Sequence, residues 1–346
     1  MILLFTCELK KILSGPALWV FVGLCIVFNM WSIPTGLNGD FDTTTKFPTN
    51  LFGGYNTNEI AESYINTFKL TDRVAESMRI KYDSLQNIVD EKAIAGDSFA
   101  PYFGESTYFM HQSLFHGIAG IMGRLLLQGI LLVTLLALLG IGYEKIHNTE
   151  HSIYASKTGR RIIYYKVAAI ITSGIALYVL LIIITLAAYF IIFDYGNVWS
   201  SSISSGFNYI DDLIGARPFT TWQRFTVVSY MWASLGISLG LLICFSFMGI
   251  IIGILSRDFY IGFLMSIIIN AVFIALPSVL PMNFYPRYTL YQTPIWLWLN
   301  SGLWFTDGGI FALWQNFETW GLLISLLISL VLCITAIKRF EKRDII

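Results

Sequence analysis

Long apolar blocks alternate with polar segments along this chain of 346 residues. Six of the blocks are nearly free of charged residues, and each approaches or exceeds the roughly 20 residues that a helix needs to cross the hydrocarbon core of a bilayer. We therefore predict an all-α polytopic membrane protein with a six-span domain made of residues 17–33 and 117–337. Its spans cover residues 17–33, 117–142, 167–193, 227–255, 259–280 and 319–337.

The beginning of the chain, MILLFTCELKKILSGP at residues 1–16, has a helical pattern of its own. Its apolar side chains fall on one helical face, and Glu8, Lys10 and Lys11 lie away from that face. A helix of this kind tends to lie in the plane of the membrane interface. We therefore predict an amphipathic interfacial helix before the first span, with a frayed beginning of that span as the alternative.

About eighty residues, 34–116, separate the first two spans. From Asn58 onward their apolar residues recur at intervals of three or four, which is the spacing of one helical face. We predict a helical extracellular insertion, formed by one long helix or by a helical hairpin. Its apolar face must be buried against itself, against a partner copy or against the outer ends of the spans. A segment of this size without cysteine is not expected to fold alone.

The composition agrees with a membrane protein, because 13% of the residues are charged, whereas soluble domains carry about 25%. The net charge of zero hides an asymmetry. With both termini inside, the inner segments hold twelve basic and six acidic residues, as the positive-inside rule requires. The basic residues are Lys10, Lys11, Lys145, Lys157, Arg160, Arg161, Lys166, Arg257, Lys338, Arg339, Lys342 and Arg343. Topology accounts for these cations, so nucleic-acid binding is not indicated.

The polar loop between the second and third spans contains the letters HNTEH at 147–151. H-x-x-E-H is the inverted zinc-peptidase signature, in which two histidines bind the metal and the glutamate is the general base. Such a site needs a third protein ligand and an enclosed position. The third ligand would have to be Glu144, Asp258, Glu341 or Asp344, all in short exposed segments. We therefore predict a solvated helix face here, with no catalytic, metal or cofactor site on this chain.

The whole loop at 143–166, YEKIHNTEHSIYASKTGRRIIYYK, resembles the first cytoplasmic loop of type-2 ATP-binding-cassette (ABC) exporter permeases. In that family an acidic residue, a Gly-Thr-like step, a short helix and a Ser…Arg…Lys tail precede the third span. The matching residues here are Glu144, Asn148, Thr149, Ser156, Arg160, Arg161 and Lys166. Asn148 stands where the family usually has glycine. The amphipathic start, the six spans and the basic tail at 338–346 extend the likeness along most of the chain.

The resemblance implies that this loop docks on a separate ATPase subunit. It also implies two such ATPases, a second permease that is identical or related, and surrounding membrane lipid, with ATP and Mg²⁺ held by the ATPases. The chain itself contains no G-x-x-x-x-G-K-[ST] phosphate loop. By resemblance it is a non-enzymatic permease of the bacterial plasma membrane, with both termini cytoplasmic, which exports a hydrophobic or amphipathic peptide, lipid or drug.

Two alternatives stay open at this stage. One is a sensor or immunity membrane protein that binds a peptide through residues 34–116 and needs no ATPase. The other concerns the docking surface within the permease hypothesis. If the loop charges do not couple to an ATPase, the surface lies at residues 1–14 or at Ser256–Asp258.

Polar residues within spans are the first candidates for a translocation path, because each is costly in lipid unless it faces protein or water. Arg124 and Gln128 share one face of the second span, with snorkelling of Arg124 as the alternative, and Asn270 lies in the fifth. Most rings of the aromatic segment 281–318 are expected to form an interfacial belt. Two of them, Trp296 and Trp304, are candidates for the exit of a path.

Overall fold

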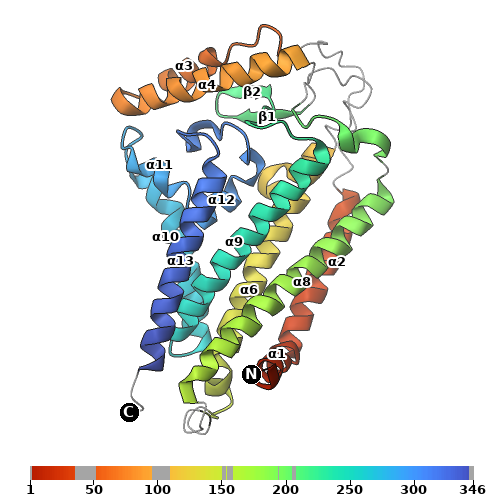
Figure 1. Cartoon of the computed structure of the whole chain (residues 1–346), viewed down its shortest axis with the longest axis vertical. Helices are drawn as coiled ribbons and strands as arrows, with labels where there is room; N and C mark the ends of the chain where they lie inside the picture. Colours follow the sequence, from red (N-terminus) through yellow and green to blue (C-terminus); the bar gives the residue numbers. More distant parts are fainter. Residues whose placement is uncertain are drawn as a thin grey trace.

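The computed structural model describes residues 2–35, 52–95, 110–149, 153, 159–193, 195–204 and 208–342. It confirms an all-α polytopic membrane protein with six helices that are long and apolar enough to span a membrane. They are α2 (Pro16–Thr35), α6 (Ile121–Ile146), α8 (Ile162–Ile192), α9 (Val227–Leu255), α10 (Phe259–Val279) and α13 (Phe317–Glu341). Figure 1 shows them as one bundle with both chain ends at the same end of it, which we call the termini end.

The second span begins at Ile121, later than predicted, because glycines redirect the backbone ahead of it. Gly117 has φ +53° and opens the short 3₁₀ element η2 (Gly117–Ala119), and Gly120 is extended with φ −72° and ψ 160°. A Cβ on Gly123 would lie 2.1 Å from the carbonyl oxygen of Gly117. The entry turn therefore packs directly on the first turn of α6, which only glycine at position 123 allows.

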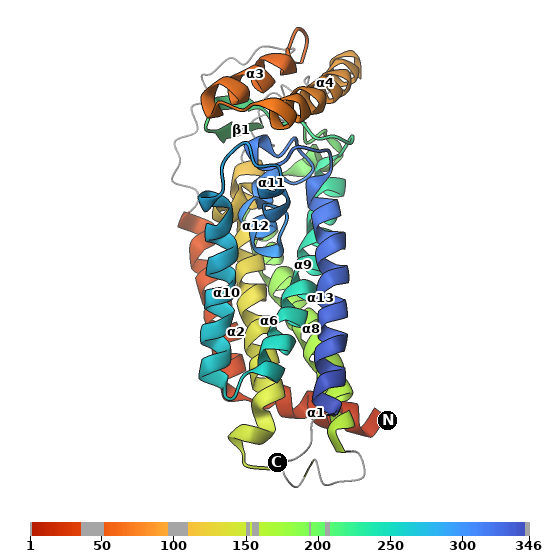
Figure 2. The same ribbon diagram turned by 90° about the vertical axis from the view of Figure 1, so that its left-hand side faces the viewer.

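Helices α6 and α9 form the centre of the bundle, where they pack on each other, and α8 and α13 pack against them. Small residues permit the close approach: a Cβ on Gly249 of α9 would lie 2.9 Å from the Cβ of Ala137 on α6. Helix α10 lies at the edge of the bundle (Figure 2) and buries only Gly262 and Pro277. Most of its surface is therefore left to lipid or to another chain.

The insertion between the first two spans contains a helical hairpin, one of the two predicted forms. Helix α3 (Thr57–Phe68) ends at Lys69, which adopts the left-handed conformation with φ 50°, and α4 (Asp72–Ala95) runs back beside it. The apolar face of the hairpin shares one core with Trp222, Tyr288, Tyr291, Ile310 and Leu313 from later segments. The hairpin therefore lies across the ends of the spans opposite the termini end (Figure 1), at what we call the hairpin end.

Short elements complete the hairpin end. The antiparallel strands β1 (Tyr209–Asp212) and β2 (Gly215–Pro218) form a small ribbon that the sequence pattern did not predict. Helices α11 (Pro286–Leu290) and α12 (Pro294–Leu299) follow α10. The single-turn elements are η1 (His111–Phe115, a π-helical turn), η4 (Gly196–Ser200), η5 (Ser301–Leu303) and η6 (Gly309–Phe311).

Protein encloses much of the aromatic segment 281–318, which corrects the predicted interfacial belt. Tyr288, Trp304 and Phe317 are 0%, 2% and 0% exposed. Helix α12 packs against α6, α9, α10 and α13, so its rings contact other spans. Phe284, at 46% exposure, is one ring that keeps a surface for the membrane interface. The belt prediction is wrong for the buried rings, because the proline-broken segment folds inward between the ends of the spans.

Helix α1 (Ile2–Leu13) crosses the termini end and packs against α8 and α6. The helix itself was predicted, but the prediction that its charges lie away from the packed face is wrong for Glu8, which is 3% exposed. The carboxylate of Glu8 lies 2.5 Å from the ammonium group of Lys11. This pair is part of a larger charged cluster at the termini end.

Candidate functional site

Glu144 and Lys166 lie at the two ends of the loop 143–166 and form an ion pair. They are 0% and 2% exposed. Lys166 Nζ also donates to the carbonyl oxygen of Gly140 at 3.0 Å. Lys11 of α1, itself paired with Glu8, places its Nζ 3.3 Å from the Oε1 atom of Glu144. The carboxylate of Glu144 therefore joins α1, α6 and α8. The ammonium groups of Lys11 and Lys166 compensate its negative charge, which would otherwise be costly to bury.

This burial corrects the prediction that Glu144 and Lys166 contact an ATPase. A side chain without exposed surface cannot form a contact with a separate chain while the bundle keeps this arrangement. The opposite charges at the two ends of the loop were visible in the sequence. Their pairing was not, because it depends on α6 and α8 being neighbours and on α1 folding back across both.

The two predicted arginines anchor the same loop to α13. Arg160 Nη1 donates to the carbonyl oxygen of Phe340 at 3.2 Å, and its guanidinium lies 5.6 Å from the centre of that ring. Arg161 Nε lies 3.2 Å from Glu341 Oε1, with 78% of the arginine side chain exposed. Both arginines belong to η3 (Gly159–Arg161), directly before α8. Arg161 thus keeps a surface for a partner, whereas Arg160 is partly covered.

The first half of the loop presents exposed residues after the end of α6. Asn148 and Thr149 are both exposed. Asn148 has φ +54°, a left-handed conformation that glycine adopts without cost and that asparagine tolerates better than most residues. Asparagine at the place where ABC permeases usually have glycine is therefore compatible with the same backbone. Ser156 lies outside the described residues.

The residues of the HNTEH pattern are only partly described. His147 is exposed, its ring stacks on Tyr143, and its Nδ1 lies 2.9 Å from the Tyr143 carbonyl oxygen. Glu150 and His151 lie outside the described residues. Within the part of the chain that the structure describes, no group of three or more His, Cys, Asp or Glu side chains is placed to hold a metal ion.

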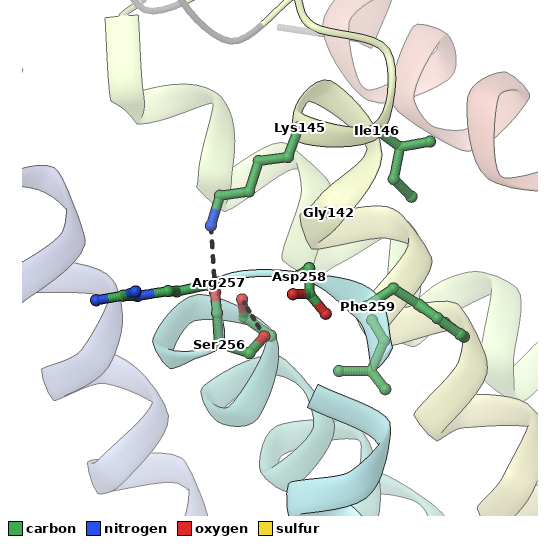
Figure 3. Close-up of a pocket in the computed structure, with 9 residues that line it drawn as sticks. Gly142, Lys145, Ile146, Ser256, Arg257, Asp258 and Phe259 are labelled. Atoms are coloured by element: carbon green, nitrogen blue, oxygen red, sulfur yellow. Dashed lines mark hydrogen bonds between the residues drawn. The ribbon is translucent and has the colours of Figure 1, made fainter. Parts of the chain in front are cut away.

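A pocket of about 210 Å³ opens beside the loop, between the end of α6 and the turn that joins α9 to α10 (Figure 3). Lys145 Nζ crosses it and donates to the carbonyl oxygen of Ser256 at 3.2 Å. Asp258 caps α10 by accepting from a backbone N–H at 2.9 Å. Arg257 and Asp258 are exposed, and the Arg257 side chain extends away from Asp258. A cation and an anion are thus presented on one rigid turn.

Of the predicted path residues, Gln128 belongs to a buried polar cluster. Its amide exchanges hydrogen bonds of 2.7 and 3.0 Å with the amide of Asn29 on α2. Asn29 also donates to Thr185 of α8 at 3.0 Å. The three side chains join three spans inside the bundle, where such bonds stabilise helix association. Arg124, one turn away on α6, is half-buried.

The other path candidates have contacts that packing explains. Asn270 donates to the carbonyl oxygen of Ser266 in its own helix at 2.8 Å. Trp296 Nε1 donates to Phe273 of α10 at 2.9 Å, and Trp304 Nε1 donates to the carbonyl oxygen of Leu297 at the same distance. The five candidates therefore occupy separate places on α6, α10, α12 and the segment after it.

A second charged cluster, at the hairpin end, was missed in the sequence. Arg217 of β2 donates from Nη1 to Asp307 and from Nη2 to Asp212, both at 2.9 Å. Tyr82 of α4 donates to Asp307, and Tyr64 of α3 donates to Asp212 at 2.5 Å. The members come from four segments of the chain, so no local spacing identifies them.

Lys81 joins the same cluster from α4. It is 3% exposed, and its Nζ donates to the carbonyl oxygens of Asp307, Gly309 and Ala312 at 3.1, 2.7 and 2.8 Å. Burial lowers the pKa of Lys81 to about 7. Burial alone would raise the pKa of Asp307, but Arg217 and Lys81 hold it below its ordinary value. The cluster fastens the hairpin to the bundle.

No protein family, no curated protein and no solved structure matches this chain.

Proposed function

We propose that the chain is the membrane-spanning permease subunit of an ATP-driven ABC exporter. The observation that carries this proposal is the anchoring of the loop 143–166 at both of its ends. The cluster of Glu144 and Lys166 fastens it to α1, α6 and α8, and Arg160 and Arg161 fasten it to α13.

Such anchoring suits a loop that transmits force. A partner that moves the loop must also move the helices to which it is fixed, because buried ion pairs resist separation. Rigid tilting of the helix bundle would then follow docking and ATP hydrolysis on the partner. The energy source has to be a separate chain, since this one contains no phosphate loop.

We place the docking surface on the exposed residues of the termini end. Asn148, Thr149 and Arg161 belong to the loop, and Arg257 and Asp258 belong to the turn beside it. The sequence offered the turn as an alternative docking surface. We include it here because Glu144 and Lys166 are buried and cannot contact a partner. Two ATPase subunits carrying ATP and Mg²⁺, and a second identical or related permease, complete the transporter. Its substrate is a hydrophobic or amphipathic peptide, lipid or drug.

The proposal puts the termini end in the cytoplasm of a bacterial cell and the hairpin end outside. Cysteine substitutions at Asp90 and Lys338, both exposed, test this orientation in intact cells. The cysteine at position 90 should react with an impermeant maleimide, and the one at 338 should react only after the membrane is opened. Labelling of position 338 alone in intact cells would contradict the orientation.

The functional test is co-purification of an ATPase subunit together with substrate-stimulated ATP turnover in lipid. The ATPase subunit to be tested is the product of the reading frame next to the gene for this chain, if that frame encodes a phosphate loop. In the triple variant Arg161→Gln, Arg257→Gln and Asp258→Asn, co-purification should fall about tenfold, because three exposed contacts of up to about 1 kcal/mol each are lost. Asparagine at 258 keeps the helix cap, so folding is preserved.

Asp90→Asn is the matched control, because it removes an exposed charge at the opposite end of the bundle. It should leave both co-purification and turnover unchanged. Normal retention of the ATPase by the triple variant would rule out this docking surface. Absence of any ATPase that binds the wild-type chain would rule out the permease function.

The second candidate is a sensor or immunity protein without ATPase coupling. It is favoured by the way Lys81, Arg217 and Asp307 lock the hairpin to the bundle, since a binding event on the hairpin would reach the spans. A chain that protects cells from a peptide when expressed without any ATPase would support this function over transport.

A further inference from the structure

The pocket beside the loop 143–166 lies where two spans end. Helix α9 ends at Leu255 and α10 begins at Phe259, so the turn 256–258 holds one wall of the pocket at the boundary of the membrane-spanning bundle. The neighbouring surface of α10 is apolar, with Tyr260 and Leu264 82% and 57% exposed. The volume of about 210 Å³ is below the roughly 300–1,000 Å³ of sites that enclose drug-sized ligands. The pocket is therefore placed and sized for a lipid headgroup whose acyl chains lie outside it, along α10.

The charged side chains that line the pocket are Lys145, Arg257 and Asp258. Lys145 is half-buried and donates to the carbonyl oxygen of Ser256 at 3.2 Å, which uses one of its three ammonium donors. Arg257 is exposed, and its guanidinium makes no hydrogen bond or ion pair among the described residues. Asp258 is also exposed, and its Oδ1 atom accepts from the N–H of Ile261 at 2.9 Å. A ligand can therefore reach two cationic groups and the second carboxylate oxygen, Oδ2.

These three charges match a ligand that carries both signs. A phosphodiester has two free oxygens, and each can accept a charge-assisted hydrogen bond from an ammonium or a guanidinium. The Asp258 carboxylate repels a phosphate that binds alone, whereas a primary ammonium on the same ligand donates to it. Figure 3 shows that the side chains of Arg257 and Asp258 extend in different directions from the turn. The pocket can therefore hold a phosphate and an ammonium at the same time.

We propose that this pocket binds the headgroup of phosphatidylethanolamine in the leaflet at the termini end. The phosphate oxygens accept from Lys145 Nζ and from the Arg257 guanidinium, and the ligand ammonium donates to Asp258 Oδ2. The acyl chains lie against the exposed apolar side of α10. This site goes beyond the permease function. Because Arg257 and Asp258 also belong to the proposed docking surface, the test uses the chain without an ATPase.

The test measures lipid binding by the purified full-length chain in detergent, with native mass spectrometry of the intact protein. The probes are dioleoyl phosphatidylethanolamine and dioleoyl phosphatidylcholine, which share their acyl chains, their phosphate and their net charge. The trimethylammonium group of phosphatidylcholine has no N–H to donate to Asp258. Phosphatidylethanolamine should therefore bind about fivefold more tightly, the upper end of what one exposed charged contact contributes.

Two variants remove different parts of this recognition. Gly142→Leu fills the pocket and keeps its charges, because Gly142 lines the pocket and a Cβ there would contact nothing beyond its own helix backbone within 4 Å. Leucine also favours a helix over glycine. Binding of phosphatidylethanolamine should fall at least about fivefold, and thermal stability should not fall. Asp258→Asn keeps the helix cap and should remove the difference between the two lipids.

Lys145→Gln removes a phosphate donor, so it should weaken both lipids equally. Lys338→Gln is the matched control, because it removes an exposed cation at the same end of the bundle but outside the pocket. It should bind both lipids like the wild type.

Three results would overturn the proposal. The first is equal binding of both lipids by the wild type, which would mean that Asp258 does not recognise the ammonium. The second is wild-type binding by the folded Gly142→Leu variant, because the lipid would then lie elsewhere. The third is an equal loss in Lys145→Gln and Lys338→Gln, which would mean that lipid binding follows only the total surface charge.

Discussion

The two ends of the bundle hold their peripheral segments with buried charges, but in different ways. At the termini end, the carboxylate of Glu144 lies between two lysines, and one of them, Lys11, has 27% of its side chain exposed. At the hairpin end, Arg217 forks between two aspartates and is 7% exposed. The first cluster is partly exposed, whereas the second lies within the core that the hairpin shares with later segments of the chain.

This difference bears on function. The planar guanidinium of Arg217 donates to Asp307 and Asp212 in fixed directions, so it restricts their positions as well as compensating their charges. The hairpin end is therefore held in one orientation. Lysine is a point charge on a flexible stem, so the termini end can shift its contacts while keeping its charge paired. In the proposed function the loop moves together with the helices to which it is fixed, which requires that the charge of Glu144 stay paired, whereas the hairpin end keeps one orientation.

The largest expected effect follows from Asp307→Ala. It leaves the buried Arg217 without one partner and removes the acceptor of Tyr82. Breaking a buried ion pair costs about 3–5 kcal/mol, so the free energy of unfolding should fall by that amount. Hydrogen exchange in α3 and α4 should accelerate. The control is Glu62→Ala, which removes a partner of Arg79 whose side chain is 48% exposed and should leave the free energy of unfolding nearly unchanged.

Glu144→Ala should have the next largest effect, about 3 kcal/mol, because Lys166 stays buried without a counter-charge. Hydrogen exchange should increase in α1 more than in α3, since Glu144 also contacts Lys11. The double variant Glu144→Leu and Lys166→Met should recover stability relative to Glu144→Ala. A stable Glu144→Ala protein with weakened ATPase binding would instead restore the prediction that this side chain contacts the partner.

A smaller effect concerns pH. Because the pKa of Lys81 is lowered to about 7 in the folded protein, the folded state loses this proton near neutrality, and the unfolded state keeps it up to about pH 10. Because the unfolded state then binds more protons than the folded state, the free energy of unfolding increases with pH. The contribution of Lys81 to it rises by about 2 kcal/mol between pH 7 and 9. Thermal unfolding of wild type and Lys81→Met across this range measures it. Parallel curves would show that Lys81 does not titrate.

The smallest effect is expected for Arg161→Ala, whose side chain is 78% exposed beside Glu341. Exposed ion pairs contribute below about 1 kcal/mol, so thermal stability should be unchanged within error. The same change should lower ATPase co-purification if the proposed docking surface is right. A clear loss of stability without an effect on the ATPase would mean that Arg161 only holds the loop to α13 and does not contact the partner.

The six spans could be predicted from the apolar blocks alone, because the free energy of transfer into lipid depends on local composition and a helix satisfies its own backbone hydrogen bonds. The sequence also predicted an amphipathic helix at 1–16, found at Ile2–Leu13, and a helical insertion. The choice between one long helix and a hairpin was settled by the left-handed backbone at Lys69, a conformation that the local pattern does not reveal for lysine.

Which charges are buried could not be predicted, because it depends on contacts between segments that are distant in the sequence. Glu144 and Lys166 are 22 positions apart, and Arg217 and Asp307 are 90 apart. Periodicity reports which face of a helix is apolar, but it does not report which helices are neighbours. A charge in a polar loop is therefore assigned to solvent by its local pattern, and it becomes a buried anchor only when segments distant in the sequence meet and pair with it.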